Sequence, residues 1–271
     1  MGKDRLTKEG ILSLSHHRFS LIVEREVTST NTLMREMADR GAPAGLALVA
    51  QRQSAGRGRL GRTFSSPDGG LYLSLLLRPA SSAKDALTVT TAAAVAVCRA
   101  LSAFVDEELR IKWVNDVYFL GKKICGILTE SVTARGKIDR LILGIGINLI
   151  QAEGGFPPEL RDIAGALFAA DPGDDVFNRV AARLLDELDR VLFSSEPGEV
   201  LEEYRRRSLL IGRDVTVTDG NRRYPARVTG ISDEYALLLT TGEGEVVSLR
   251  SGEVSFSQWK GDKRISLSPE D

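Results

Sequence analysis

The stretch from Leu46 to Gly70 has the sequence LALVAQRQSAGRGRLGRTFSSPDGG and decides between two fold classes. An apolar run typical of a buried strand is followed by Gly56-x-Gly58-x-x-Gly61, the spacing of a dinucleotide-binding fingerprint. That fingerprint requires a helix to open at its end and an acidic residue about twenty positions further on. A proline and two glycines follow instead, and the expected acid position falls near Arg78. We therefore exclude a Rossmann site.

The same loop alternates glycine with arginine, at Arg57, Arg59 and Arg62. Glycine lets the backbone approach a ligand closely, and the planar guanidinium of arginine matches phosphate and carboxylate. The pattern indicates a flexible loop that closes over an anion. A solvated basic loop or a linker is the alternative that this stretch alone leaves open.

Composition limits the class of protein. The 271 residues allow one large domain or two unequal ones, and 42% hydrophobic with 27% charged residues is ordinary for a globular chain. A net charge of −1 argues against a polyanion binder, so phosphate binding has to be local. Cys98 and Cys125 lie in apolar runs, as reduced core thiols do. With no membrane-length apolar run and no signal core, we expect a cytoplasmic protein without a membrane partner.

Hydrophobic periodicity predicts an α+β domain with a mixed sheet over residues 1–208. Strands are expected at 19–27, 46–50, 71–77, 109–113, 115–120, 123–132 and 141–147. Helices are expected at about 7–15, 29–41, 83–105 and 174–207, the last broken at Pro197, with a turn near Gly136. His16 and His17 are expected in a surface loop without metal-ligand company.

The sequence pattern changes near Leu209, from long helical and strand segments to short strands. Five short alternating strands separated by turn residues follow within about 50 residues, which predicts a small closed β-barrel over 209–260. Such a module is marginal alone and is expected to dock on the larger domain. The polar tail 261–271 is expected to be disordered.

A second polar motif, Lys112-Trp113-Val114-Asn115-Asp116, combines a lysine, an amide and a carboxylate. Oxygen ligands suit a hard cation and lysine suits phosphate, so the motif indicates a magnesium–phosphate site. Asn-Asp also begins many turns, which leaves a structural role open. Lys123 stands between a glycine turn and a buried strand, where it either holds a substrate carboxylate or extends to solvent as an edge lysine.

Together these segments resemble the biotin protein ligases over about residues 20–256. The motifs that carry the resemblance occur in the family's order: Ser29-Thr30-Asn31, Gln53-x-Ala55-Gly56-Arg57-Gly58-Arg59-x-Gly61-Arg62, Lys112-Trp113-x-Asn115-Asp116, Lys123-x-x-Gly126-Ile127-Leu128 and Gly144-x-Gly146-x-Asn148. The resemblance implies a class II synthetase-like catalytic domain with an SH3-like C-terminal barrel. It also implies a two-step reaction, in which biotin and ATP give biotinyl-5′-AMP and a lysine of biotin carboxyl carrier protein then takes the biotinyl group.

By position, the resemblance implies a role for each motif residue. The biotin-binding set is Ser29, Thr30, Asn31, Gln53, Arg57, Gly58, Arg59 and Lys123. The ATP-binding set is Arg59, Lys112, Asn115, Asp116 and Asn148, with Asn115 and Asp116 serving Mg²⁺. Arg59, Lys112 and Lys123 carry the catalytic role, by aligning and neutralising two anions. A homodimer, common in the family, is carried over as an expectation.

Some positions depart from the family pattern. Val114 stands where proline is common, and Phe64 stands where tryptophan is frequent. Phe256-Ser257 replaces the usual Leu-Arg, so we assign no C-terminal arginine contact. Only 28 residues precede Ser29, too few for the winged helix of repressor members, so we expect an enzyme that does not bind DNA.

Two other functions compete with this interpretation. A lipoate protein ligase shares the fold and the adenylate chemistry, although its arginine loop typically lacks the repeated Gly-Arg seen here. A nucleic-acid-binding module could use the arginines as a basic patch, but the net charge is near zero and no aromatic residues are interleaved with them.

Overall fold

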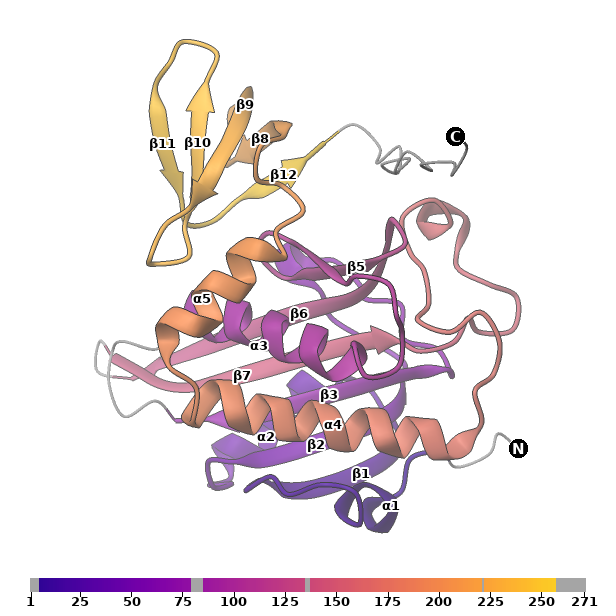
Figure 1. The fold of residues 1–271 in the computed structure, drawn as a ribbon. Helices are drawn as coiled ribbons and strands as arrows, with labels where there is room; N and C mark the ends of the chain where they lie inside the picture. Colours follow the sequence, from indigo (N-terminus) through magenta and orange to yellow (C-terminus); the bar gives the residue numbers. More distant parts are fainter. Residues whose placement is uncertain (1–4, 79–84, 135–136, 221, 257–271) are drawn as a thin grey trace, which may run out of the picture.

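The structure, a computed structural model, describes residues 5–78, 85–134, 137–220 and 222–256. Seven strands form one sheet in the order β1-β2-β3-β7-β6-β5-β4 (Figure 1). Their bounds are β1 (Ser20–Val27), β2 (Leu46–Gln53), β3 (Gly70–Leu77), β4 (Arg110–Lys112), β5 (Asp116–Phe119), β6 (Lys122–Ala134) and β7 (Lys137–Asn148). β1 pairs with β2 in parallel and the other neighbours are antiparallel, so the predicted mixed sheet is confirmed.

Helices cover both faces of this sheet. α2 (Thr30–Asp39) packs on one face against Leu48, Leu76 and Ile142, while α3 (Ala86–Leu101) and α4 (Asp174–Phe193) pack on the other (Figure 1). Because side chains alternate along a strand, apolar residues at successive positions supply both cores. The whole of β3 is buried for this reason, as the apolar run predicted.

Local signals fix most element boundaries. The side chain of Ser29 caps α2, and Gly41, with φ +92°, follows its end. Pro197 begins α5 (Pro197–Arg206), as the expected break requires. The helix predicted over 7–15 is shorter, α1 (Lys8–Leu12): the side chain of Thr7 caps its start, and Ser13 is the C-cap that follows its end. The turn near Gly136 and the tail 261–271 lie outside the described residues.

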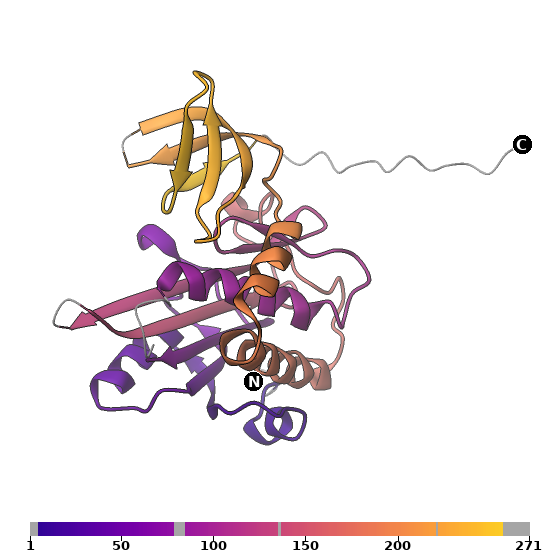
Figure 2. The ribbon, with the colours of Figure 1, turned by 60° about the vertical axis from the view of Figure 1, so that its left-hand side comes forward.

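A second sheet follows α5. Its strands are β8 (Asp214–Asp219), β9 (Arg222–Ile231), β10 (Leu237–Thr241), β11 (Val246–Leu249) and β12 (Glu253–Ser255), antiparallel in the order β11-β10-β9-β8-β12. Figure 2 shows this sheet, in orange and yellow, as a separate unit at one end of the main sheet. A separate C-terminal antiparallel sheet is therefore confirmed. Its closure into a barrel and the boundary at residue 209 stay predictions.

The two sheets are joined along β4 and α5. The backbone N–H of Ile111 donates to Arg207 (2.8 Å), and that of Leu209 donates back to Ile111 (2.7 Å). The Trp113 indole also donates to the carbonyl of Tyr235 in the second sheet (2.9 Å). The C-terminal sheet thus sits directly against the polar motif that begins at Lys112.

Both cysteines are buried free thiols in the main core, as expected. Burial raises the pKa of Cys98 to about 12 and that of Cys125 well above its usual value. Neither thiol is a ready nucleophile. His16 is exposed as predicted, whereas His17 is half-buried and stacks on Phe19, with burial lowering its pKa. No helix in the described ranges is long and apolar enough to cross a membrane.

Glu203 on α5 binds α3 and the end of its own helix. Its carboxylate accepts from Arg99 (2.8 Å) and Arg207 (2.8 Å) and is 13% exposed. Burial alone would raise the pKa of Glu203, but the hydrogen bonds from Arg207 and Arg99 outweigh it and hold the pKa below its ordinary value. A lowered folded-state pKa means that this stabilisation is present above the unfolded pKa and is lost as pH falls through the folded one.

We predict that Glu203→Gln lowers the free energy of unfolding at pH 7 by about 1.5–3 kcal/mol, the contribution of a hydrogen bond to a charged group. The gap between variant and wild type should shrink at pH values below about 4.3, the unfolded glutamate pKa. Urea unfolding at several pH values measures both effects. Glu202→Gln, an exposed neighbour on the same helix, is the control and should change little. A gap that stays constant down to pH 3 would contradict the prediction.

Candidate functional site

A cavity of about 510 Å³ opens between the main sheet, the arginine loop and the second sheet. Its wall includes every residue that the sequence analysis selected as a site residue: Ser29, Thr30, Asn31, Gln53, Arg57, Gly58, Arg59, Lys112, Asn115, Asp116, Lys123 and Asn148. These residues come from α2, β2, the loop after β2, the β4–β5 turn, β6 and β7. The fold therefore brings together motifs that are up to 119 residues apart in sequence, from Ser29 to Asn148.

The floor of the cavity is made of glycines on two central strands. Gly126 on β6 faces Gly146 on β7 across the strand pair. A Cβ atom at Gly146 would lie 2.6 Å from the Phe64 ring, and one at Gly126 would lie 2.9 Å from it. A Cβ atom at Gly144 would overlap the Oδ1 atom of Asn31. Side chains are thus excluded from this stretch of floor, and the space is available to Phe64, Asn31 and a ligand.

The N-terminus of α2 forms one corner of the cavity. Thr30 donates its backbone N–H (2.8 Å) and its hydroxyl (3.1 Å) to Oε1 of Gln53. Gln53 in turn donates to Ser66 (2.8 Å). Asn31 accepts from the Ser74 hydroxyl (2.6 Å) and donates to Glu130 (2.9 Å). These bonds fix polar groups at the corner before any ligand binds.

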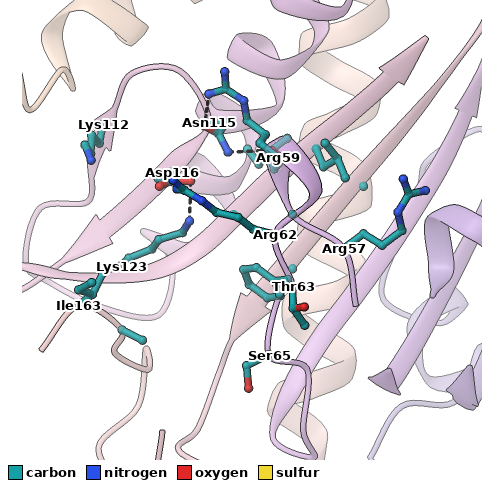
Figure 3. A pocket seen from close by; sticks show the side chains of 18 of the residues that line it. Arg57, Arg59, Arg62, Thr63, Ser65, Lys112, Asn115, Asp116, Lys123 and Ile163 are labelled. Carbon is teal, nitrogen blue, oxygen red and sulfur yellow. Dashed lines mark hydrogen bonds and ion pairs between the residues drawn. The ribbon is translucent and has the colours of Figure 1, made fainter. Parts of the chain in front are cut away.

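The opposite corner is cationic (Figure 3). Lys123 Nζ lies 2.8 Å from Oδ1 of Asp116, and Arg59 donates to Oδ1 of Asn115 (3.0 Å). Burial lowers the pKa of Lys112, and the nearby Asp116 opposes that shift. The four basic side chains here (Arg59, Arg62, Lys112 and Lys123) outnumber the acidic side chains of Asp116 and Glu253, so the corner favours anions.

The turn that carries Asn115 and Asp116 is held from three sides. The Tyr204 hydroxyl on α5 donates to the carbonyl of Val114 (3.0 Å), and Trp113 donates to the second sheet. Asn115 donates its side-chain amide to the carbonyl of Ile127 and accepts from the same residue's N–H, both at 2.9 Å. The peptide bond between Trp113 and Val114 is cis. Hydrogen bonds therefore fix the turn at the position where the family's proline is absent.

The arginine loop lies over the cavity and is bound at both ends. Arg57 pairs with Glu130 on the main sheet (3.1 Å). Arg59 donates to the carbonyl of Gly252 (3.3 Å), and Arg62 pairs with Glu253 in the second sheet (2.7 Å). Sequence analysis missed Glu253, because its partner is 191 positions away and no local pattern signals the pair.

The segment between β7 and α4 forms a further wall that the sequence analysis also missed. Phe156, Leu160 and Ile163 line the cavity, and the carbonyl of Ile163 accepts from the backbone N–H of Lys123 (2.8 Å). Asn148 donates to the carbonyl of Gly165 (3.0 Å) on the same segment. Apolar residues spaced through an otherwise polar connection were the available signal.

The protein alone does not supply a complete metal cage in the part of the chain that the structure describes, since no three His, Cys, Asp or Glu side chains cluster there. Mg²⁺ normally uses one or two carboxylates together with substrate phosphates and water. Asp116, with the amide oxygen of Asn115, fits that limited requirement.

Comparison with known proteins agrees with this geometry. The chain matches the Biotin/lipoate A/B protein ligase family over residues 23–148 and the Biotin protein ligase C terminal domain over 210–257. It is 35% identical to a bifunctional ligase/repressor BirA of Bacillus spizizenii, over 88% of this chain and 78% of that protein. It is 31% identical to the biotin--[acetyl-CoA-carboxylase] ligase of Paracoccus denitrificans, over 84% of this chain and 97% of that protein.

Among solved structures, the biotin protein ligase of Aquifex aeolicus in complex with biotin and ATP superposes with a TM-score of 0.70. Sequence identity is 32%, and the match covers 89% of this chain and 99% of that one. The two family matches, over 23–148 and 210–257, fall on the main sheet and on the second sheet respectively.

Gly144→Ala tests the glycine floor. The added methyl group overlaps Asn31, which is 4% exposed and cannot move without breaking its bonds to Ser74 and Glu130. We expect ligand affinity at the α2 corner to fall at least tenfold, since a charged hydrogen bond contributes roughly 1.5–3 kcal/mol. Isothermal titration calorimetry with biotin, which the superposed Aquifex aeolicus structure contains, measures the loss. Gly230→Ala, where a Cβ atom meets only an ordinary contact at 3.7 Å, is the control. Wild-type affinity in Gly144→Ala would show that the floor tolerates a methyl group.

Proposed function

The chain belongs to the biotin protein ligase family, and from that premise we propose how its cavity works: biotin and ATP react there to give biotinyl-5′-AMP, and a lysine of a carrier protein then takes the biotinyl group. The observation that carries the proposal is the single cavity, with a glycine floor and hydrogen-bonding corner at one end and a cationic corner at the other. A ring system with a hydrogen-bonding ureido group and a carboxylate arm, meeting a nucleotide, has this distribution of chemistry.

The first step needs two anions to approach one another. The biotin carboxylate attacks the α-phosphorus of ATP, a C–O–P anhydride forms, and pyrophosphate leaves. Alignment and charge neutralisation are the main requirements, and no covalent nucleophile on the protein is needed. We assign Lys123 to the carboxylate and the developing phosphoester, and Arg59 and Lys112 to the phosphates. Approaching phosphates favour the charged form of Lys112 and so counteract the effect of its burial.

The second step transfers the acyl group. The neutral ε-amine of the acceptor lysine attacks the acyl carbonyl, an amide bond forms, and AMP leaves. Since the mixed anhydride reacts with water or with any exposed amine, the arginine loop has to retain it until the acceptor arrives. The loop's contacts with both sheets support this role.

Mg²⁺ supplies further neutralisation of the ATP phosphates when bound. Asp116 and Asn115 are the residues that would hold it, through one carboxylate and one amide oxygen. Asn148 is assigned to the adenosine side of the cavity, where it is already oriented by Gly165.

The proposal also extends to the acceptor protein, the cellular compartment and the oligomeric state. The relatives named for acetyl-CoA carboxylase suggest its biotin carboxyl carrier protein as the acceptor. Two buried reduced thiols support action in the cytoplasm. We also propose, from the sequence, that the protein does not bind DNA, which a gel-shift assay tests. We further propose that it is a homodimer, which analytical sedimentation tests.

One reaction tests the proposal as a whole. The protein is incubated with ATP, Mg²⁺, biotin and a carrier domain, and mass spectrometry should show one added biotinyl group on that domain. Lipoate in place of biotin, and as a competitor in ATP–pyrophosphate exchange, separates the two ligase classes. Preferential exchange with lipoate, or no exchange with either acid, would refute the proposal.

We predict that Lys123→Ala lowers the rate of adenylate formation about 100- to 1000-fold, the effect of removing one preorganised charge-stabilising donor. The fold should persist, because the side chain lies at the cavity and not in a core. Pyrophosphate exchange gives the rate and circular dichroism the fold. Lys122→Ala, whose Nζ bonds the carbonyls of Arg161 and Asp162 outside the cavity, is the matched control. Near wild-type exchange by Lys123→Ala would remove this lysine from the mechanism.

Arg59→Ala should release biotinyl-5′-AMP faster. Arg59 bonds both Asn115 and Gly252, and losing a charged donor costs roughly 1.5–3 kcal/mol, or about 10- to 150-fold in dissociation. Escaped adenylate then labels lysines on unrelated proteins. The adenylate off-rate and labelling of a lysine-rich bystander protein measure the effect. Arg52→Ala, an arginine before the loop and outside the cavity wall, is the control. Unchanged retention and selectivity would show that Arg59 does not hold the intermediate.

A further inference from the structure

We propose that Glu130 is a positioning residue that couples the biotin corner of the cavity to the arginine loop; this inference rests on the proposed function. Glu130 lies on β6, two residues beyond the cavity-lining Leu128, and is itself outside the wall. Its side chain is 14% exposed. Burying a carboxylate this far from water costs desolvation free energy, unless several hydrogen-bond donors compensate for the lost water.

Three donors from two separate segments meet this carboxylate. Asn31 Nδ2 lies 2.9 Å from it, Arg35 Nη2 lies 2.8 Å away, and Arg57 Nη1 lies 3.1 Å away. Asn31 and Arg35 are four residues apart on α2 and therefore share a face of that helix. Arg57 comes from the loop that covers the cavity. Glu130 is thus the point at which α2, β6 and the loop meet.

On the biotin side, Glu130 determines which way the Asn31 amide faces. The Ser74 hydroxyl donates to Oδ1, and Nδ2 donates to Glu130 and to the carbonyl of Leu128 (3.4 Å). If the amide were reversed, its oxygen would face the carboxylate. The charged acceptor therefore keeps Oδ1 on the side of Ser74 and of the missing Cβ of Gly144, next to the floor.

On the loop side, Glu130 accounts for the position of Arg57. Figure 3 shows the Arg57 side chain extending away from Arg59, Arg62 and the cationic corner. It is 47% exposed and has Glu130 as its ion-pair partner, whereas Arg62 pairs with the second sheet. Backbone N–H groups at the base of the loop donate to Val27 and Thr28, and the Glu130 carboxylate adds a side-chain anchor to the main sheet beyond them. A fixed anchor lowers the entropy that the loop loses when it orders over a ligand.

Because one side chain holds both partners, their order is thermodynamically linked. A ligand that fixes Asn31 favours the position of Glu130 that also binds Arg57, and an ordered loop favours the Asn31 amide in return. Biotin affinity and loop order should consequently fall together when the charge at position 130 is removed.

The test uses Glu130→Gln in the full-length protein, with biotin as the probe and without ATP or acceptor. We expect the biotin Kd to rise about tenfold, the lower end of what a charged hydrogen bond contributes. Trypsin cleavage after Arg57, Arg59 and Arg62 should become several-fold faster, measured by mass spectrometry relative to cleavage after Arg227 in β9. Biotin should slow the loop cleavage strongly in wild type and weakly in the variant.

Glu26→Gln is the matched control, since Glu26 is a half-exposed glutamate on β1 that faces Arg52 at 3.7 Å outside the cavity. Its Kd and loop cleavage should equal those of wild type. Glu130→Asp keeps the charge but shortens the side chain, so it should show the same two changes at smaller size even if Glu130→Gln does not fold.

Faster loop cleavage with an unchanged biotin Kd would overturn the coupling, and so would a changed Kd with wild-type cleavage. If neither changes, Glu130 has no positioning role. Failure of the wild-type protein to bind biotin would refute the proposed function instead, and the cleavage comparison would still report whether Glu130 anchors the loop.

Discussion

Three missing side chains on adjacent central strands make the rest of the site possible. Gly126, Gly144 and Gly146 sit at paired or alternating positions of β6 and β7, where the surrounding strand residues are large and apolar. Glycine weakens a strand by entropy and by lost packing. The sheet accommodates this because its other face is covered by α3 and α4. The apolar core on the opposite face of the sheet thus offsets the packing that the glycines lose on the cavity face.

Residues of both sheets form the wall of the cavity. Tyr204 and Trp113 hold the Val114 turn between α5 and the C-terminal sheet, while Arg59 and Gly252 connect the loop to β12. Each of these contacts includes a hydrogen bond that places one group, and Tyr204 also packs edge-on against Tyr235 in an apolar core that both sheets share. The cationic corner therefore has its geometry set from outside the strands that carry its charges.

Local sequence signals were sufficient for most of the elements, and the family resemblance supplied the motif residues of the cavity wall, whereas Phe156, Ile163 and Glu253 in the same wall were missed. The apolar run of β3, the helix break at Pro197 and the glycine after α2 each act within a few residues, so they could be read directly. Partners could not. Glu130 and Glu253 look like ordinary surface acids in sequence, and only the folded chain brings them to Arg57 and Arg62. The half-buried state of His17 was missed for the same reason.

A floor without side chains also limits how the site can change over generations. At Gly126, Gly144 and Gly146 no smaller residue exists, and every larger one meets Phe64 or Asn31. Mutation at these positions can therefore remove space above the floor, but it cannot adjust the shape of the floor to a different ligand. Substitutions that change which acid binds therefore have to fall in the arginine loop or in the two corners of the cavity. Sequence variation that alters ligand choice should accumulate there, while the three glycines stay constant.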